Sequence, residues 1–579
     1  MPGFVLEIGS EPLKNFSEEK RKHLLVESIE GKNYYVQRRT IRKFLGDKPF
    51  VKTEDFVIVI DGVVLNKNEL LSKYVSEDFA RVIIDMYKQN GENFFKEFKG
   101  SFSGALYDMR NDKWIIWTNH YGDKQVFYYK NKGRLLVASE INFIVDYLRN
   151  NKLNYSLNKL GAYCLLTFGY MLEDNTLFNE IRKLKAGHYM VYKDGNLEIK
   201  QYYKLDNTPD KSLTEDEIID GIEKLFRNAV KLEYEKDREY GYRHIASLSG
   251  GLDSRMSLYI AHELGFKDIL IYCFSQSNYL DEQISKRIAS DLGYEYIFKA
   301  LDNGIYLKNL EEVVAINFGN CIYSGHSHVK NFVDLLNWDR FGILHTGQLG
   351  DVVVGTYLTK KKSDPFSIAY SKKLIGKVES LVVGTVNEYE NEELFKFCTR
   401  GFNGILQGNL PAQEYTEVAS PFLDHEFLSF AMKIPIELRK DHYIYFKWIL
   451  KNRREAAKYK WEKIKAKITT PKIKLFGRIV PVNRLPNLVI RVLLNRRHSM
   501  KTKFHMNPLD YWYETSHELR NFLDEHFKRL INYFEEDKEL RQDLINLYTN
   551  GDTVEKTQTL TFLEAYRRYF LGIEDGDEL

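Results

Sequence analysis

This chain of 579 residues has few cysteines and almost no surplus of positive or negative charge. The cysteines are only four, Cys164, Cys273, Cys321 and Cys398, and no two of them form a C-x-x-C pair. This spacing argues against a disulfide framework and against a zinc site. With 84 Lys and Arg against 81 Asp and Glu, the net charge is only +3. We therefore expect no nucleic-acid partner, because such proteins carry a clear basic surplus.

Long apolar runs and a common nucleotide-binding pattern are missing as well. The first residues, Met1 to Phe4, lack the basic-then-apolar pattern of a signal peptide, and no segment is long enough to span a membrane. We therefore expect a soluble cytoplasmic protein. The phosphate-binding pattern G-x-x-x-x-G-K-[ST] does not occur. The hydrophobic content of 44% suffices for full cores, and the length indicates two to four domains.

The most informative stretch is Ser-Gly-Gly-Leu-Asp-Ser-Arg at 249–255. A short apolar-leaning run at 244–248 precedes it, and apolar residues at helical spacing follow it until Gly265. We interpret this pattern as strand, tight loop and helix. Such a geometry directs several backbone N–H groups and a helix N-terminus at one point, which suits an anion.

The residue types in this loop favour a phosphate accompanied by a metal ion. The two glycines allow the backbone to approach the anion closely, and the two serines add hydroxyl donors. A carboxylate repels phosphate unless it holds Mg²⁺, which prefers carboxylate and phosphate oxygens. The string resembles the pyrophosphate-binding loop of ATP-pyrophosphatases, which cleave ATP to AMP and pyrophosphate. The residues predicted to bind ATP there are Ser249, Gly250, Gly251, Leu252, Asp253 and Ser254.

The first two hundred residues are predicted to be mostly antiparallel β-structure with a few helices, an α+β pattern. Residues 56–60 and 63–66 read as a hairpin turning at Asp61-Gly62, and 100–108 pairs with 113–118. Further strands are predicted at 126–129 and 135–138, and helices at 70–74 and 79–87.

From 206 to 216 a polar stretch with Pro209 reads as a linker. The chain then alternates between strands, predicted at 244–248, 269–274 and 342–345, and helices, predicted at 218–226, 256–264 and 281–292. This alternation predicts a parallel sheet. Ligands of such sheets bind at the carboxyl ends of the strands, where the 249–255 loop and Phe274 both lie. The chain after residue 427 is predicted to be mainly helical.

Several segments together resemble the asparagine synthetase family over nearly the whole chain. The matches in the first half are at 61–70, 100–102, 121–129, 138–140 and 176–188, and those in the second half are at 249–255, 346–351, 420–425 and 447–450. The resemblance implies an Ntn-hydrolase-like glutamine amidotransferase domain at 1–205, the linker at 206–216, and an α/β ATP-pyrophosphatase domain with a helical C-terminal part at 217–579. In this family the first domain frees ammonia from glutamine. The second domain adenylates a carboxylate, and an amine then displaces AMP.

The first domain departs from the family pattern at three positions. The family nucleophile is an N-terminal cysteine exposed by removal of Met, but position 2 here is Pro2. The family oxyanion pair Asn-Gly appears as Asp61-Gly62, where a carboxylate would repel an oxyanion. The acidic residue that would hold the glutamine amine aligns with Phe79. We therefore predict that this domain is degenerate and has no glutaminase activity.

The second domain keeps more of the pattern. Asp253 and Asp351 align with the Mg²⁺-binding carboxylates, and Gly347 with the ATP-binding motif. Lys447 aligns with the lysine that neutralises charge on phosphate and the reacting carbonyl. The catalytic glutamate of the family is Gln348 here, which cannot accept a proton but can bind a substrate.

Each of these assignments has a plainer alternative. Asp351 could cap a helix, and Lys447 could be a surface lysine. His326 and His328 could touch a substrate, but a structural role is the favoured interpretation for both. Asp424 is predicted to be structural and to fix a turn before the next helix. The basic stretch at 447–503 could be a solvated face or a loop that closes over pyrophosphate or an acidic substrate.

We therefore predict an AMP- and pyrophosphate-forming amide ligase that needs ATP and Mg²⁺. Its substrates would be a small-molecule, peptide or glycan carboxylate and either ammonia or a substrate amine. The alternatives are a conventional asparagine synthetase, a non-catalytic ATP-binding protein that regulates or binds a partner, and a sulfur transferase acting on tRNA.

Overall fold

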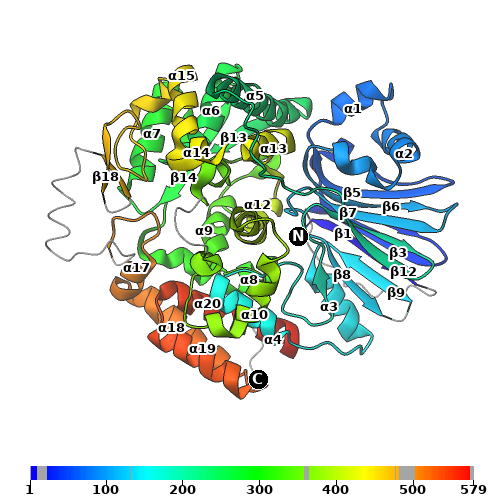
Figure 1. Ribbon diagram of the computed structural model, residues 1–579. Helices are drawn as coiled ribbons and strands as arrows, with labels where there is room; N and C mark the ends of the chain where they lie inside the picture. The colour runs from blue at the N-terminus through cyan, green and yellow to red at the C-terminus, as the bar shows by residue number, and fades with distance from the viewer. Residues whose placement is uncertain are drawn as a thin grey trace.

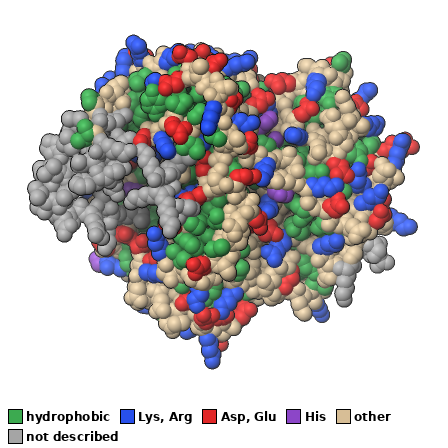
Figure 2. Space-filling view, in the orientation of Figure 1, with side chains coloured by type: hydrophobic (Ala, Val, Ile, Leu, Met, Phe, Trp, Pro, Cys, Tyr) green, Lys and Arg blue, Asp and Glu red, His purple; other side chains and the backbone are tan. Residues whose placement is uncertain are grey.

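The computed structural model describes residues 2–9, 23–131, 133–357, 364–475, 478–481 and 502–573. Strands dominate the first two hundred residues and helices the last hundred and fifty (Figure 1). Among the described residues, no helix combines the length and the apolar character needed to cross a membrane. The Lys and Arg side chains on the face shown in Figure 2 are interspersed with Asp and Glu, as the small net charge predicts.

Two six-stranded antiparallel sheets form the first part of the chain. The first sheet has the order β10-β8-β9-β1-β3-β2 and the second β12-β11-β7-β6-β5-β4. The strands of the first sheet are β1 (Gly3–Ile8), β2 (Leu24–Glu30), β3 (Tyr34–Ile41), β8 (Phe127–Asn131), β9 (Arg134–Ala138) and β10 (Arg182–Lys183). Those of the second are β4 (Phe50–Lys52), β5 (Phe56–Val64), β6 (Gly100–Asp108), β7 (Lys113–Thr118), β11 (His188–Lys193) and β12 (Asn196–Gln201).

The two sheets bury one core between them. Phe4, Leu6 and Val36 of the first sheet pack with Val59 and Ile116 of the second, and all are almost fully buried. The outer face of the second sheet is covered by α1 (Lys67–Lys73) and α2 (Phe79–Asn90), which form a second apolar core with it. This is the α+β arrangement that the sequence predicts for the first two hundred residues.

The predicted hairpin at Asp61-Gly62 is wrong. Strand β5 runs without a turn from Phe56 to Val64, and it pairs with β6 along its whole length. Gly62 has φ +106° inside the strand, and a Cβ there would lie only 2.1 Å from the carbonyl oxygen of Ser101. Gly62 therefore permits a close contact between β5 and β6. In a sequence pattern, a glycine with this role looks the same as a glycine in a turn.

The second part contains the predicted parallel sheet, in the order β15-β14-β13-β16-β17. Its strands are β13 (Arg243–Ser247), β14 (Ile269–Ser275), β15 (Glu295–Ala300), β16 (Phe341–His345) and β17 (Val418–Ala419). One face packs against α5 (Glu215–Glu239), α6 (Asp253–Glu263) and α7 (Leu280–Leu292). The other face contacts α9 (Ser324–Val333) and α12 (Leu410–Gln413). Helix α5 begins inside the stretch expected to be a linker, where Thr214 and Glu217 form a capping box.

The remaining helices lie mostly around this sheet and toward the C-terminus, except for α3, which lies beside β8 and β9 of the first sheet (Figure 1). They are α3 (Ile141–Asn150), α4 (Lys159–Phe168), α8 (Leu310–Asn317), α10 (Ile375–Val386), α11 (Glu392–Lys396), α13 (His425–Lys433), α14 (Ile436–Arg439), α15 (Tyr443–Asn452), α17 (Leu509–Thr515), α18 (His517–Ile531), α19 (Lys538–Asn550) and α20 (Thr553–Tyr566). Helices α3 and α4 share one apolar core with α18 to α20, so the early and late parts of the chain fold against each other. The short strands β18 (Lys472–Leu475) and β19 (Arg478–Pro481) pair with each other.

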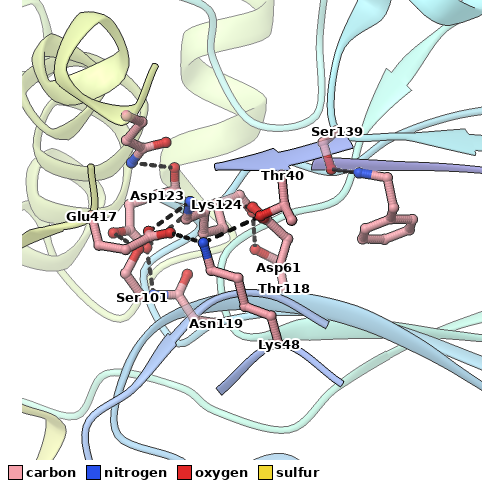
Figure 3. A network of polar contacts seen from close by, with 12 residues as sticks. Thr40, Lys48, Asp61, Ser101, Thr118, Asn119, Asp123, Lys124, Ser139 and Glu417 are labelled. Carbon is pink, nitrogen blue, oxygen red and sulfur yellow. Dashed lines mark hydrogen bonds and ion pairs between the residues drawn. The ribbon is translucent and has the colours of Figure 1, made fainter. Parts of the chain in front are cut away.

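A buried chain of charges joins the two parts (Figure 3). Lys124 Nζ lies 3.2 Å from Asp61 Oδ2 and 2.8 Å from Glu417 Oε2. Lys48 Nζ lies 2.7 Å from Glu417 Oε1. These side chains are at most 5% exposed, so each charge relies on its partners rather than on water. Burial alone would lower the pKa of Lys124, but Asp61 and Glu417 outweigh it and raise that pKa well above its ordinary value.

Lys124→Met should destabilise the fold strongly, because it leaves Asp61 and Glu417 buried without their shared counter-charge. We expect a loss of about 3–5 kcal/mol in the free energy of unfolding, measured by urea denaturation. Adding Asp61→Asn to Lys124→Met should recover much of this loss, because Glu417 keeps Lys48 as its partner. An effect below about 1 kcal/mol for the single variant would contradict the assigned network.

Candidate active site

The loop at 249–255 lies where β13 ends and α6 begins, as its sequence predicts. Its serines hold the loop in shape: the Gly251 N–H donates to Ser249 Oγ at 3.1 Å, and the Ser249 N–H donates to Ser254 Oγ at 3.2 Å. The Gly250 N–H donates to Asp281 Oδ1 at 2.7 Å. The hydroxyl groups of Ser249 and Ser254 therefore hold the conformation of the loop from which α6 begins at Asp253.

The segment at 346–351 packs directly on this loop. A Cβ at Gly347 would lie 2.4 Å from the Ser254 nitrogen, and one at Gly350 would lie 2.5 Å from Asp253 Cγ. Only glycine at both positions allows the two segments to approach this closely. Leu349, between them, has φ +62°, a left-handed conformation that is costly for a leucine. This contact fixes the position of the 346–351 segment relative to the 249–255 loop.

Two carboxylates meet at this contact. Asp253 is half-buried, and its Oδ1 accepts a hydrogen bond from Tyr445 Oη at 3.1 Å. Burial, followed by the charge of Asp351, raises the pKa of Asp253 to about 8. Asp351 makes no side-chain capping hydrogen bond to the turn that follows it, so the alternative role as a cap is not seen. A divalent cation would relieve the repulsion between the two groups, so they suit Mg²⁺.

The loop borders two neighbouring cavities. The first, which we call the loop cavity, has a volume of about 280 Å³ and includes Ser249, Ser254, Phe274, Gly347 and Gln348 in its lining. The second, the carboxylate cavity, has a volume of about 170 Å³. It is lined by Asp253, Asp351, Tyr445, Glu462 and Lys463 among others. Gly251 and Asp253 line both. Every predicted ATP-binding residue except Gly250 lines one or both of these cavities.

Lys447 does not lie in this site, so its predicted placement there is wrong. It stands on α15, its side chain is 44% exposed, and it pairs with Glu215 at the surface. Lys463 lies in the carboxylate cavity instead, with its Nζ 4.0 Å from Asp351 Oδ2. The neighbouring Glu462 N–H donates to the Gly250 carbonyl at 3.1 Å, which ties this segment to the loop. Lys463 falls within the basic stretch that was expected to close over a ligand, and the part of that stretch at 482–501 lies outside the described residues.

Arg255 belongs to the support of the loop. Its guanidinium is fully buried and donates to the carbonyl oxygens of Gly250, Ala456 and Lys460 at 2.7–3.1 Å. It lines neither cavity. The long side chain therefore connects the loop to the segment that carries Lys463.

Gln348 faces the loop cavity and is held by two polar contacts. Its Oε1 accepts a hydrogen bond from Asn409 Nδ2 at 2.5 Å, and its backbone oxygen accepts one from Ser420 Oγ at 2.9 Å. Asn409 lines the same cavity, although no motif pointed to it. The Gln348 amide can orient a bound molecule but cannot take a proton from it.

The two histidines at 326 and 328 are neutral at physiological pH. Burial lowers the pKa of each to about 4. His328 lines the loop cavity, whereas His326 is buried behind it and its Nδ1 contacts the Ile322 carbonyl. Asp424 caps α13 by accepting the N–H groups of Glu426 and Phe427, so its predicted structural role is confirmed.

The positions that correspond to a glutaminase site carry other contacts. Asp61 is ion-paired to Lys124, which together with Lys48 offsets the effect of burial and keeps the pKa of Asp61 below its usual value. Phe79, the first residue of α2, is buried in the core between that helix and the second sheet, and Pro2 is buried just before β1. Asp61 is therefore an ion-paired, buried carboxylate, and the residue at position 2 carries no thiol.

The fold consists of a glutamine amidotransferase-type part followed by a parallel-sheet domain with a glycine-rich loop at the start of α6. The family model of the glutamine amidotransferase domain matches residues 40–203. The chain is 26% identical over 318 residues to a putative glutamine-hydrolysing asparagine synthetase 2 of Methanocaldococcus jannaschii, covering 53% of this chain and 59% of that one. It is 27% identical over 207 residues to asparagine synthetase B of Escherichia coli (34% and 31%) and 24% identical over 299 residues to amidase chyE of Penicillium rubens (46% and 42%).

The resemblance to the asparagine synthetase family that the motifs predicted is thereby confirmed. The chain spans less than two thirds of the length of these three relatives.

The pair of carboxylates predicts a stability that depends on pH. The folded pKa of Asp253 is raised from 3.8 to about 8, so its protonated form favours the fold. This contribution is present below about pH 4 and is lost as the pH rises through about 8. In EDTA, we therefore expect the thermal midpoint to fall between pH 6 and 8.5, and Mg²⁺ to restore it at pH 8.5.

Asp253→Asn should flatten this pH dependence and remove the response to Mg²⁺. Asp85→Asn serves as the matched control and should behave like the parent, because the Asp85 side chain on α2 is 41% exposed. If Asp253→Asn kept both the pH dependence and the Mg²⁺ response, the site would be elsewhere.

Proposed function

We propose that this protein is an ATP-dependent carbon–nitrogen ligase that releases AMP and pyrophosphate. It would adenylate a carboxylate in the loop cavity and couple it to ammonia or to an amine of the substrate. The observation that carries this proposal is the contact between the 249–255 loop and the 347–351 segment, which brings the glycine-rich loop at the start of α6 and two carboxylates together. The names of the relatives support the same class of reaction.

ATP and Mg²⁺ are the cofactors that fit this arrangement. Asp253 and Asp351 would hold Mg²⁺, which supplies charge neutralisation on the phosphate oxygens when it is bound. The start of α6, together with the hydroxyl groups of Ser249 and Ser254, would receive the pyrophosphate end of ATP. Phe274 and the loop cavity offer the apolar wall and the volume for the rest of the nucleotide.

Lys463 takes the role for which Lys447 was predicted. It lies beside Asp351 at the mouth of the carboxylate cavity, with its side chain 48% exposed. From there its ammonium group can stabilise the negative charge that develops on the leaving pyrophosphate and on the reacting carbonyl. Gln348 would orient the carboxylate substrate through its side-chain amide.

We propose that the amidotransferase part has no glutaminase activity and serves as a scaffold. The Asp61–Lys124–Glu417 chain occupies the corresponding position with a structural role. Ammonia would then come from solution, or the amine would belong to the substrate, which is a small-molecule, peptide or glycan carboxylate. A conventional asparagine synthetase remains the second candidate, favoured by the relatives, and we place the protein in the cytoplasm.

Lys463→Ala should lower kcat by roughly 10²-fold, because it removes charge stabilisation that the transition state needs. The measurement is pyrophosphate exchange into ATP with a panel of carboxylates, beginning with aspartate and sugar acids, followed by steady-state kinetics on the responding substrate. Lys447→Ala is the matched control and should equal the parent. A large loss in Lys447→Ala with none in Lys463→Ala would reverse the assignment.

The purified protein should release no glutamate from glutamine in the presence of ATP, Mg²⁺ and a responding carboxylate. Loss of a catalytic nucleophile ordinarily costs several orders of magnitude in rate. A coupled glutamate assay detects the product, and ammonium chloride in place of glutamine provides the comparison. Glutamate release at a rate comparable to ligation would show that a nucleophile exists elsewhere in the chain.

A further inference from the structure

Two histidines and an aspartate converge on one point inside the parallel-sheet part. His244 is the second residue of β13, His345 is the last residue of β16, and Asp237 lies near the end of α5. All three are buried, with at most 5% of each exposed, and none of them lines the loop cavity or the carboxylate cavity. Among the described residues, they are the only three His, Cys, Asp or Glu side chains whose donor atoms all lie within 4.8 Å of one another.

The three donor atoms have the chemistry of a small metal site. His345 Nε2 and His244 Nδ1 each lie 2.8 Å from the same oxygen, Asp237 Oδ2. Tetrahedral zinc separates such ligand atoms by about 3.3 Å, so each ring nitrogen would move outward by about half an ångström. Two imidazoles and one carboxylate suit a zinc-like ion, whereas Mg²⁺ takes oxygen ligands. None of the ligands is a cysteine, so the spacing of the four cysteines does not bear on this site.

The Asp237 carboxylate is held in place by strand β16. Its Oδ1 accepts the Ile343 N–H at 2.7 Å, which leaves Oδ2 for the two histidines. A Cβ at Gly342 would lie 2.0 Å from Oδ1, so only glycine at that position lets the carboxylate reach the strand. A ligating carboxylate that is itself hydrogen-bonded in this way is the usual arrangement around a bound metal ion.

His345 is oriented by a second carboxylate and by an aromatic ring. Its Nδ1 lies 3.3 Å from Oε2 of Glu233, one turn before Asp237 on α5. The Tyr234 ring stacks on the imidazole, with the ring centroids 3.8 Å apart. A metal-ligating histidine typically donates its other ring N–H to a carboxylate, which fixes the tautomer that presents the free nitrogen to the metal. Glu233 is in the position of such a partner.

A divalent ion would also balance the charge of this buried group. With both imidazoles neutral, the charges of the ion, Asp237 and Glu233 cancel, which matters where water does not reach the side chains. In the alternative without a metal, the same contacts are hydrogen bonds, and His345 must carry a proton on each ring nitrogen because each faces a carboxylate. The metal content of the protein distinguishes the two cases.

We propose that Asp237, His244 and His345 bind a divalent transition-metal ion, with zinc as the ion that fits best, and that Glu233 positions His345 for it. The ion would join the end of α5 to the neighbouring strands β13 and β16. Because β16 leads directly into Thr346 and the 347–351 segment, it would stabilise the strand from which that segment starts. The site has a structural role, and its existence does not depend on the proposed ligase function.

Metal analysis of the full-length protein tests this site without any substrate. The protein is purified from cells grown with added zinc, dialysed against metal-free buffer with Mg²⁺, and measured by inductively coupled plasma mass spectrometry. We expect about one zinc ion per chain, and less than about a tenth of that in His345→Gln. His517→Gln, the same change at an exposed histidine, should keep the zinc content of the parent. A zinc-free parent whose thermal midpoint does not respond to added zinc would overturn the proposal.

A second variant keeps all three ligands and so guards against a folding defect in His345→Gln. Glu233→Gln removes only the carboxylate behind His345, and it should raise the zinc Kd by about 10-fold or more. Glu235→Gln, whose side chain is 46% exposed on the same helix, should keep the Kd of the parent. The measurement is competition with a chromophoric zinc chelator. Equal zinc Kd values in the parent and in Glu233→Gln would place the ion elsewhere and refute the assignment.

Cobalt reports the ligands directly in the parent protein. Cobalt added to the chelator-treated protein should give visible absorption bands typical of a four-coordinate site with nitrogen and oxygen ligands, and an equal amount of zinc should abolish them. Bands typical of six oxygen ligands, unaffected by zinc, would mean that the ion occupies a carboxylate site such as Asp253 and Asp351, and would contradict the proposal.

Discussion

The close contact between the 249–255 loop and the 347–351 segment is the constraint on which the rest of the site depends. Gly347 and Gly350 bring the second segment within 2.4–2.5 Å, measured from an added Cβ, of the backbone and carboxylate of the first. This contact places Asp253 beside Asp351 at a cost in electrostatic repulsion, seen in the raised pKa of Asp253. A bound cation would offset this repulsion between the two carboxylates.

The two parts of the molecule depend on each other through buried charge. Lys124 and Asp61 come from the amidotransferase part, and Glu417 comes from the segment that leads into β17. The residue after Ala419 in that segment is Ser420, which holds the backbone of Gln348. The amidotransferase-type part is therefore linked through buried charge to the segment that holds Gln348.

Sequence patterns predicted much of the fold because local signals were consistent. Alternating strands and helices identified the parallel sheet, and the glycine and serine spacing at 249–255 identified the loop at its edge. The turn assigned to Gly62 failed because a glycine in a tightly paired strand looks the same in sequence as one in a turn.

The sequence could not predict where a side chain points or which residue, distant along the chain, it contacts. Lys447 and Lys463 lie in one basic stretch, and only the hydrogen bond from Glu462 to Gly250 shows which lysine reaches the loop. The contact between Glu233 and His345 joins residues 112 positions apart, so no spacing rule could pair them. Helical periodicity places Glu233 on α5 but does not reveal the histidine that it contacts.

The central claim is that a carboxylate of the substrate attacks the α-phosphate of ATP. The most direct test is to incubate the protein with MgATP, ammonium and a responding carboxylate labelled with ¹⁸O, and to follow the label by ³¹P NMR and mass spectrometry. Transfer of one ¹⁸O atom from the carboxylate into AMP, with pyrophosphate as the second product, is the result that the account predicts. Label in inorganic phosphate together with ADP would contradict it.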